Sequence, residues 1–478
     1  MPMSINQTSI HWFRQDLRTA DNPALLSAAS SGRVIPVYIF DDSIPDELQI
    51  SGASKVWLHH SLDSLNHTLN GHLRCFRGNP VTILEKLCKK YNVKYVAWNR
   101  AYDPWRIEQD PKVKAILHSI GIKGQSFNGS LLWEPWETLK ADGSPYRVFT
   151  PFYKNGCLSA DAPRPPLSAP QICYHDEKLE PSNLDNLGLL DNQSWEADLI
   201  SKWRVGEDGA SAKLENFLNE GIKNYKDGRN FPAQQSVSGL SPHLRWGEIS
   251  VNTVWYATKK QLKERPQLGE NANHFLSELG WREFSYSLLY HFPSLPTKNL
   301  NPRFEKFPWV KDQVGLKAWK SGRTGIPIVD AGMRQLWNIG YMHNRLRMIV
   351  GSFLVKNLRI HWHHGQAWFW DTLFDADLAN NSAGWQWIAG CGADAAPYFR
   401  IFNPVTQGLK FDPDGSFIRQ FVPELEKVPA KYIFDPWNAP QDILATSGVV
   451  LGETYPNPIV DLKMSREKAL EAFATLKA

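Results

Sequence analysis

The sequence predicts two domains, an N-terminal α/β domain with a doubly wound parallel sheet and a larger, all-helical C-terminal domain. The chain has 478 residues, which is too many for one ordinary hydrophobic core. Short β-branched runs alternate with helical patterns near the start, whereas nearly every periodic stretch after Trp203 has helical spacing. We therefore expect an α/β domain over residues 1–130, a linker over 131–200 and a helical domain over 201–478.

Four strands are expected in the first domain, because short apolar and β-branched runs occur at residues 8–13, 34–40, 75–78 and 94–98. Between and after them, apolar residues spaced three and four apart predict helices at 53–69, 80–91 and 111–120. Alternation of strand and helix is typical of a parallel sheet with helices on both faces.

The composition changes between residues 162 and 192, where Pro, Ser, Leu and Asp dominate and periodicity is weak. Such a stretch predicts a long connection over the surface. Farther on, helical spacing covers residues 210–224, 271–289, 328–357 and 366–374. The second domain should therefore be mainly α.

The composition excludes several classes of protein. No run of about 18 apolar residues occurs and the N-terminus lacks a secretory pattern, so we expect a cytoplasmic protein that does not bind membranes. The five cysteines are scattered and form no CxxC pair, which argues against a disulfide framework and a zinc site, and we expect no metal. A net charge of +4 is too small to indicate a polyanionic partner by itself. Only a local basic face on the surface could bind one.

Tryptophan is unusually frequent, with 20 copies in the chain and 13 of them between Trp203 and Trp437. Most of these must be anchors of a large helical core. A minority is expected to carry chemistry.

Three segments of the helical region are more specific: WREF at 281–284, MHNRLRM at 342–348 and DADLANNSAGWQW at 375–387. They resemble the photolyase and cryptochrome family. Supporting matches run from HWFRQDLRTADNPAL near the start to GRTGIPIVDAGMRQL at 322–336 and APYFRIFNPVTQGLKF at 396–411. The resemblance covers nearly the whole chain and implies an α/β antenna domain joined to a helical domain that binds FAD.

The segment SVSGLS at 236–241, followed by Pro242 as a plausible first helical residue, offers hydroxyl and backbone donors for the phosphates of a dinucleotide. Taken alone, it is also an ordinary helix cap. The resemblance implies that it holds the FAD phosphates. The family pattern has an arginine where this chain has Gly239, so part of the phosphate charge must come from elsewhere or be absent.

Asp375 and Asp377 would repel each other if both were buried, so at least one of them needs a cation. The resemblance implies that Arg347 pairs with Asp375 at the flavin edge; two solvated helix-cap aspartates are the alternative. Asn381 is expected to face the reactive edge of the ring, where an amide suits reduced, anionic flavin. The FAD-binding set that the resemblance implies is Tyr225, Val237, Ser238, Gly239, Leu240, Ser241, Phe275, Arg282, Asn344, Arg347, Asp375, Ala376, Asp377 and Asn381.

The resemblance also implies an electron path of three tryptophans, with Trp385 nearest the flavin, then Trp362 and then Trp309. Without the resemblance, each of these residues would be assigned to the core.

A pyrimidine dimer must be flipped out of the duplex before an electron can be injected into it. The resemblance implies that Trp281 and Trp387 form the walls of the pocket and that Glu278 hydrogen-bonds the dimer. Asn344 and Met348 are four residues apart, so they share one helix face toward flavin or lesion. The residues expected to bind the DNA backbone are Arg229, Arg345, Arg400 and Gln407.

The expected activity is therefore that of a carbon–carbon lyase, which splits cyclobutane pyrimidine dimers in DNA by electron transfer from reduced FAD. A six-four photolyase is less favoured, because the resemblance implies that such enzymes use a pair of histidines in the helix at 342–348, whereas this chain has only His343 there, out of phase with the pocket face. A cryptochrome-type blue-light photoreceptor is the main alternative. The segments at 99–105 and 126–135 resemble bacterial photolyases related to plant cryptochromes, which favours methenyltetrahydrofolate as the antenna, with a deazaflavin as the alternative. We expect a monomer.

Overall fold

The computed structural model describes residues 7–175, 183–191, 193–395 and 399–476, and the contacts divide the chain into two compact units. The first, here called the sheet unit, consists of Met1–Glu220 with Ser238–Pro293. The second, the helical unit, consists of Gly221–Val237 with Ser294–Ala478. This division does not test the boundaries predicted from the sequence, which stay a prediction.

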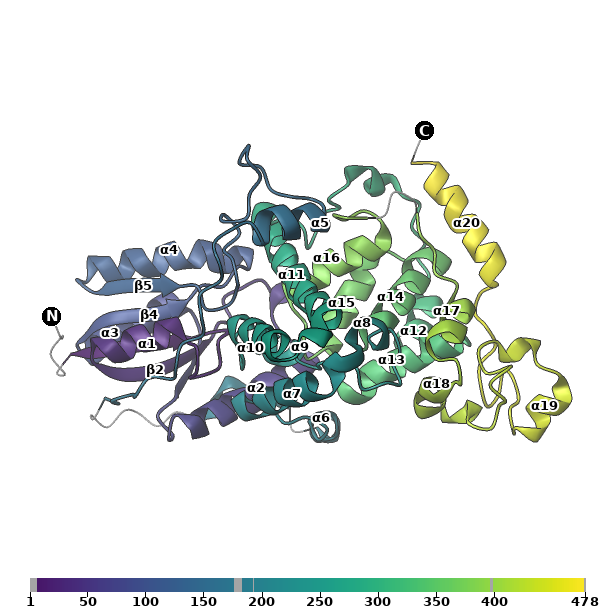
Figure 1. Cartoon of the computed structure of the whole chain (residues 1–478), viewed down its shortest axis with the longest axis horizontal. Coiled ribbons are helices and arrows are strands. Elements are labelled where there is room, and N and C mark those ends of the chain that lie inside the picture. The colour runs from purple at the N-terminus through teal and green to yellow at the C-terminus, as the bar shows by residue number, and fades with distance from the viewer. Residues whose placement is uncertain (1–6, 176–182, 192, 396–398, 477–478) are drawn as a thin grey trace. The chain divides into compact units, whose positions relative to one another are not determined.

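Five parallel strands form one sheet in the order β3-β2-β1-β4-β5 (Figure 1). They are β1 (Thr8–Phe13), β2 (Arg33–Phe40), β3 (Arg74–Arg77), β4 (Val93–Asn99) and β5 (Lys123–Phe127). The doubly wound parallel sheet is confirmed, and the four predicted strands are found to within one residue at each end. The edge strand β5 was not predicted, because its sequence KGQSF is mostly polar and only partly buried.

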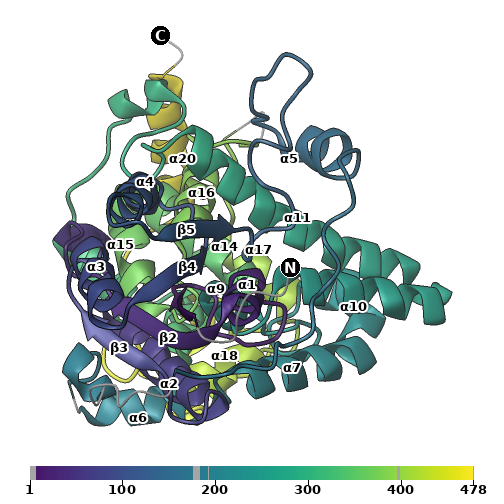
Figure 2. The ribbon, with the colours of Figure 1, turned by 90° about the vertical axis from the view of Figure 1, so that its left-hand side faces the viewer.

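Helices cover both faces of this sheet (Figure 2). On one face lie α3 (Pro80–Lys90) and α4 (Pro104–Ser119), whose Leu84 and Leu117 share a buried core with Ile10 and Trp12 of β1. On the other lies α1 (Pro23–Ser31), where the Ser9 hydroxyl donates to the carbonyl of an α1 residue at 3.0 Å. Successive side chains of β1 thus point to opposite faces of the sheet, as expected for a strand that is buried on both sides.

The sheet unit also holds seven other α-helices among its described residues, and they surround the segments that carry predicted site residues. These are α2 (Gly52–Thr68), α5 (Phe149–Pro151), α6 (Ser194–Ile200), α7 (Glu207–Asn219), α9 (Ser241–Trp246), α10 (Val251–Glu264) and α11 (Gly269–His291). The described parts of the predicted connection at 162–192 are irregular, apart from a short turn at Leu184–Leu187 and an isolated bridge at Tyr174.

The helical unit packs its longer helices around one apolar core, and Figure 1 shows α13 to α16 together within it. Trp319, Trp362, Trp385 and Met333 are all buried in this core. The helices are α8 (Tyr225–Gly228), α12 (Gln313–Lys320), α13 (Pro327–Ile339), α14 (Asn344–Ser352), α15 (Trp362–Thr372), α16 (Leu378–Ala389), α17 (Pro404–Phe411), α18 (Ser416–Phe421), α19 (Gln441–Thr446) and α20 (Leu462–Ala474).

The stretch 328–357, which spacing predicts as helical, is interrupted. Helix α13 ends before Gly340, which has a φ of 63°, and a Cβ at that position would lie 2.6 Å from the ring of Phe374. The next helix, α14, starts only after His343, and residues Phe353–Asn357 form a π-helical turn. Apolar periodicity carries through such breaks, so it does not reveal them.

None of the helices in the described ranges combines the length and the apolar character needed to cross a bilayer.

Candidate functional site

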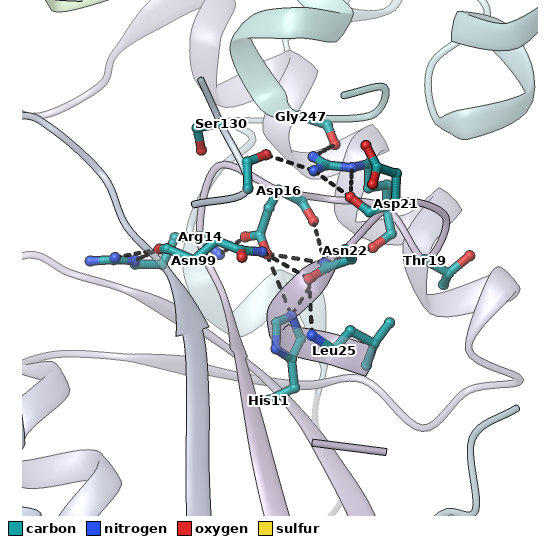
Figure 3. A network of polar contacts seen from close by, with 12 residues as sticks. His11, Arg14, Asp16, Thr19, Asp21, Asn22, Leu25, Asn99, Ser130 and Gly247 are labelled. Atoms are coloured by element: carbon teal, nitrogen blue, oxygen red, sulfur yellow. Dashed lines mark hydrogen bonds and ion pairs between the residues drawn. The ribbon is translucent and has the colours of Figure 1, made fainter. Parts of the chain in front are cut away.

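A dense polar cluster lies at the carboxyl ends of β1 and β4, where the strand order reverses and where ligands bind in many parallel sheets (Figure 3). Asp16 is its centre, because Asn99 Nδ2 donates to Asp16 Oδ2 at 2.6 Å and Asn22 Nδ2 donates to it at 3.1 Å. His11 Nε2 lies 3.4 Å from the same oxygen. Burial acts to raise the pKa of Asp16, but the hydrogen bond and charge of His11 bring this pKa down to about 2.

Two arginines close the cluster. Arg14 forms a buried ion pair with Asp110, with Nη1 2.8 Å from Oδ1. Arg18 donates to the carbonyls of Gly129 and Gly247, at 2.7 and 2.9 Å. These guanidinium groups bind residues of the protein itself. We call this group of residues, centred on Asp16, the strand-end cluster and interpret it as structural.

The predicted ion pair between Arg347 and Asp375 is present in the helical unit. Arg347 Nη2, from α14, donates to Asp375 Oδ2 at 2.7 Å, and its Nε donates to the carbonyl of Met342 at 2.8 Å. Burial acts to lower the pKa of Arg347, while the charge of Asp375 raises it above its ordinary value. The other carboxylate oxygen, Asp375 Oδ1, is buried and accepts no hydrogen bond from the described residues. The pair therefore offers an acceptor to a ligand that carries an N–H or O–H donor.

Asp377 and Asn381 take different positions on α16. Asp377 is the N-cap of this helix and its side chain accepts from the backbone N–H of Asn380 at 2.8 Å. Asp377 therefore caps the helix but is buried, and Asp375 is ion-paired, so the alternative of two solvated caps is wrong. Asn381 Nδ2 donates to the carbonyl of Gln366 at 3.0 Å, which fixes the orientation of its amide.

The three tryptophans of the predicted electron path gather around the start of α15. Trp362 is the first residue of that helix and is fully buried, and its ring lies 5.5 Å from that of His361. The His361 ring in turn lies 4.9 Å from the ring of the half-buried Trp309. A Cβ at Gly365 would lie 2.1 Å from the Trp385 ring, so this ring packs directly on the first turn of α15.

A second pair of tryptophans in the helical unit was not singled out from the sequence. The rings of Trp337 and Trp368 are parallel, with an angle of 2° and a centroid distance of 5.9 Å. Trp337 is 62% exposed, and Lys320 Nζ lies 4.7 Å from the Trp368 ring. They line a groove of about 500 Å³ together with Lys317 and Arg334. No periodicity or motif marks this groove, because its residues come from three helices.

Helix α14 carries three of the predicted lesion and DNA residues, Asn344, Arg345 and Met348. Asn344 and Met348 lie one turn apart, and Arg345 Nη1 lies 3.8 Å from Met348 Sδ. Arg345 also donates to the side-chain oxygen of Asn230, and its guanidinium lies 4.2 Å from the ring of Phe411. The arginine is thus held by three contacts beside the Asn344–Met348 face.

His343 is the N-cap of α14, where its side chain accepts from the backbone N–H of Arg345 at 3.2 Å. Burial lowers the pKa of His343 to about 4, and the charges of Arg229, Arg345 and Arg347 act in the same direction. The imidazole is therefore neutral near pH 7 and caps the helix, rather than facing the side shared by Asn344 and Met348.

Trp387 and Arg400 line one cavity of about 710 Å³ in the helical unit. Trp387 Nε1 donates to the carbonyl of Asp394 at 3.1 Å, which fixes its indole. Gln407 lies on α17, and its Oε1 is buried without a hydrogen-bond partner among the described residues. Sequence reasoning missed three basic residues that also line the cavity, namely Arg303, Lys356 and Arg466.

The proposed phosphate-binding segment is divided between the units, with Tyr225 and Val237 in the helical unit and Ser238 to Ser241 in the sheet unit. Helix α9 begins at Ser241, one residue before the expected start at Pro242, and its N-cap is Leu240 with no side-chain cap bond, so the alternative of an ordinary serine cap is wrong. Ser238 Oγ instead accepts from the N–H of Leu240 at 3.3 Å, because Gly239 turns the chain with a φ of +63°.

Trp281 and Glu278 lie one turn apart on α11 in the sheet unit. The Trp281 indole stacks on Phe149 at a centroid distance of 3.8 Å and an angle of 9°, and Tyr153 stacks on Phe149 at 5.6 Å. Glu278 Oε1 lies 3.8 Å from His274 Nε2. The stack fixes the plane of Trp281, and no sequence signal indicates this role of Phe149. Phe275, a predicted FAD-binding residue on the same helix, is buried against Phe217.

Arg282 donates to the neighbouring Glu283 at 3.1 Å, and Glu283 also accepts from the backbone N–H groups of Leu132 and Trp133, at 2.9 and 3.2 Å. Burial raises the pKa of Glu283 to about 7, although the charge of Arg282 and these N–H groups act to lower it. This carboxyl group therefore joins α11 to the loop at residues 131–133.

Comparison with known proteins gives matches along the chain. The family described as "FAD binding domain of DNA photolyase" matches residues 275–475, and the family described as "DNA photolyase" matches residues 9–171.

Among curated proteins, a deoxyribodipyrimidine photo-lyase of Agrobacterium fabrum is 48% identical, over 98% of both chains. Cryptochrome-2 of Arabidopsis thaliana is 38% identical over 99% of this chain and 79% of its own length. Among solved structures, a bacterial class III photolyase from Agrobacterium tumefaciens superposes with a TM-score of 0.94 and 47% identity, covering 100% of this chain and 99% of that one.

Proposed function

The chain belongs to the photolyase and cryptochrome family, and from this premise we propose that it uses light and FAD to split cyclobutane pyrimidine dimers in DNA. The observation that carries the proposal is the similarity to a bacterial photo-lyase over nearly the full length of both chains. The class III photolyase structure, similar over the whole chain, supports it further.

The residues fit FAD, which supplies the light-driven electron when bound. In the helical unit, the unpaired Asp375 Oδ1 beside Arg347 offers an acceptor for a flavin N–H or a ribose hydroxyl. The FAD-binding residues that we propose in the helical unit are Tyr225, Val237, Asn344, Arg347, Asp375, Ala376, Asp377 and Asn381. Those that we propose in the sheet unit are Ser238, Gly239, Leu240, Ser241, Phe275 and Arg282.

The dimer-binding residues that we propose are Trp281, as a stacking face, and Glu278, as a hydrogen-bond partner, in the sheet unit, and Trp387, Met348 and Asn344 in the helical unit. The stack on Phe149 supports this role for Trp281, because it holds one face and leaves part of the indole exposed. Arg229, Arg345, Arg400 and Gln407 would hold the phosphate backbone, so binding should weaken with salt and ignore sequence.

The ring contacts around α15 support an electron path through Trp385, Trp362 and Trp309. Trp385 and Trp362 are buried and Trp309 is half-buried, so the series runs from the core of the helical unit toward its surface. In this proposal the path restores the reduced cofactor and takes no part in dimer splitting.

We propose that the antenna, methenyltetrahydrofolate or alternatively a deazaflavin, binds in the groove of Trp337 and Trp368 rather than in the α/β domain. The parallel indoles suit a flat heteroaromatic ring, and Lys317 and Lys320 suit the carboxylates of a folate tail, whereas Arg334 is paired with Glu424. In the sheet unit, the strand-end cluster occupies the place where a ligand would bind. We also propose that the protein is a monomer in the cytoplasm and that its domain boundaries are 1–130, 131–200 and 201–478.

The test is repair of oligothymidylate that contains cyclobutane dimers, measured as recovered thymine absorbance under blue light with a reductant. Repair in the light and none in the dark is expected. Unchanged dimers, together with FAD that still photoreduces, would instead favour a cryptochrome-type photoreceptor. A duplex with a six-four photoproduct, tested in parallel, should remain unrepaired.

A further inference from the structure

A cation that the sequence did not point to lies beside the turn at Gly239. The side-chain atoms nearest to a Cβ placed on Gly239 all belong to Lys213 of α7, and its Nζ is 3.4 Å away. Gly239 has no side chain and a φ of +63°, so it leaves the space beside the turn open to the lysine ammonium.

Lys213 has no anionic partner among the residues that the structure describes. It is half-buried and forms no hydrogen bond or ion pair within that part of the chain; its charged contact is with the Trp203 ring, at 4.7 Å. Burial lowers the pKa of the Lys213 amine, and no neighbouring carboxylate opposes this effect. A partly desolvated ammonium without a counter-ion is unfavourable, and a bound anion would offset that cost.

The position of Lys213 is set by a buried aromatic group. The Trp203 ring meets Trp57 edge to face at 5.3 Å and lies 6.5 Å from the His243 ring. Trp57 Nε1 donates to Glu248 at 2.9 Å, and Glu248 also pairs with His243. Trp203 is thereby held against the segment that follows the Gly239 turn, and it supports the stem of Lys213 beside that turn.

We propose that Lys213 supplies the positive charge for the FAD pyrophosphate at the turn formed by Ser238 to Ser241. This inference rests on the proposed binding of FAD and deepens it. The serine hydroxyls and backbone N–H groups of the turn offer hydrogen bonds but no net charge, and the chain has glycine at position 239. Lys213 brings a point charge to the same place from another helix.

Binding of flavins to the apoprotein, followed by quenching of flavin fluorescence, separates this role from simple packing. Lys213→Met keeps the aliphatic stem on Trp203 and removes the charge. It should weaken FAD binding about 10- to 100-fold, as expected for a charge-assisted hydrogen bond. Riboflavin, which has no phosphate, should bind wild type and variant equally. Lys213→Arg should restore most of the FAD affinity.

Lys259→Met is the matched control, because Lys259 also lies over an indole of the sheet unit, that of Trp255 at 4.9 Å. It should leave both affinities unchanged. Equal weakening of FAD and riboflavin by Lys213→Met would overturn the inference, and so would unchanged FAD affinity. Circular dichroism checks that each variant is folded. Dimer repair is not read in this assay, so normal FAD binding without repair would count against the proposed function alone.

Discussion

The strand-end cluster of the sheet unit and the tryptophan groove of the helical unit lead to opposite conclusions about where ligands bind. The cluster is rich in charge, yet its groups bind one another: Asp16 with Asn99 and His11, and Arg14 with Asp110. The groove exposes the Trp337 indole, and of its three basic residues Lys317 is exposed and Lys320 half-buried, whereas Arg334 is already paired with Glu424. Paired charges make a structure rigid, whereas uncovered rings and unpaired groups are available to a ligand.

The same difference separates two aromatic pairs. Trp281 and Phe149 stack at 3.8 Å, so nothing can enter between them and Phe149 acts as a support. Trp337 and Trp368 are parallel at 5.9 Å, and the outer ring is largely exposed. Two further groups fit the same rule, because Asp375 Oδ1 has no hydrogen-bond partner and Lys213 has no anionic partner among the described residues.

Asp16→Ala should give the largest effect if the strand-end cluster is structural. It removes the buried carboxylate that accepts from Asn99 and contacts His11, which leaves these two side chains only their polar contacts with Asn22 among the described residues. Loss of one member of such a buried set costs about 3–5 kcal/mol of unfolding free energy. Urea denaturation measures the loss, and FAD affinity of the folded protein should not change. A variant of wild-type stability would mean that the cluster is available for binding.

Two buried titratable groups should give opposite pH dependences, one in each unit. In the folded sheet unit, the pKa of Glu283 is raised to about 7 from an ordinary value of 4.5. The folded state therefore holds a proton that the unfolded state releases, so this stabilisation is present below pH 4.5 and is lost as pH rises to about 7. Glu283→Gln should remove this dependence, worth about 3 kcal/mol, from urea unfolding measured across that range.

His343 in the helical unit should act in the other direction. Its pKa falls to about 4 from an ordinary value of 6.5, so its stabilisation is present above pH 6.5 and is lost as pH falls toward 4. His343→Asn retains a side chain that can cap α14. It should remove the loss of unfolding free energy between pH 6.5 and 4, an amount similar to that for Glu283. A His343→Asn profile that falls in acid as steeply as wild type would contradict this account.

The sequence predicts the parts of this molecule that depend on local pattern or on a motif. The strands β1 to β4 follow from short apolar or β-branched runs, and the Arg347–Asp375 pair follows from two family segments. Strand β5 has no such pattern, since its polar residues form a strand only because β4 offers it an edge. Helix α1 was missed as well, although Asn22 caps it and Pro23 opens it.

Lys213 and Phe149 show why the remaining site residues escape prediction. Each acts through a residue that lies far along the chain, Gly239 for Lys213 and Trp281 for Phe149. Neither belongs to a motif, and both look like ordinary helix or core residues in sequence. Only the tertiary fold brings such partners together, so periodicity and residue type contain no signal for them.

Trp337→Ala tests the open aromatic pair directly. It should remove or strongly reduce the antenna absorption band of the purified protein and leave the FAD band in place, because stacking on one indole is worth about 1–3 kcal/mol. The loss corresponds to about 5- to 150-fold weaker binding of the added chromophore. Val314→Ala alters another exposed apolar residue of the helical unit, outside the groove lining, and should have no effect. An unchanged antenna band in Trp337→Ala would exclude the groove.

Phe149→Leu tests the closed pair and should give the smallest effect. Leucine fills most of the space but cannot stack, so Trp281 loses a fixed plane and the aromatic pairing worth about 0.5–1.5 kcal/mol. Binding of dimer-containing DNA should weaken about two- to tenfold, while the repair rate of bound substrate in the light stays the same.

The double variant Phe149→Leu with Trp281→Ala decides whether Phe149 acts through the indole. If it does, Phe149→Leu should have no further effect on DNA binding once Trp281 has been removed. Additive losses would mean that Phe149 contributes to binding in another way, and the distinction between supporting and ligand-facing rings would then fail at this pair. FAD content of each variant, read from its absorption spectrum, shows that the flavin site is intact.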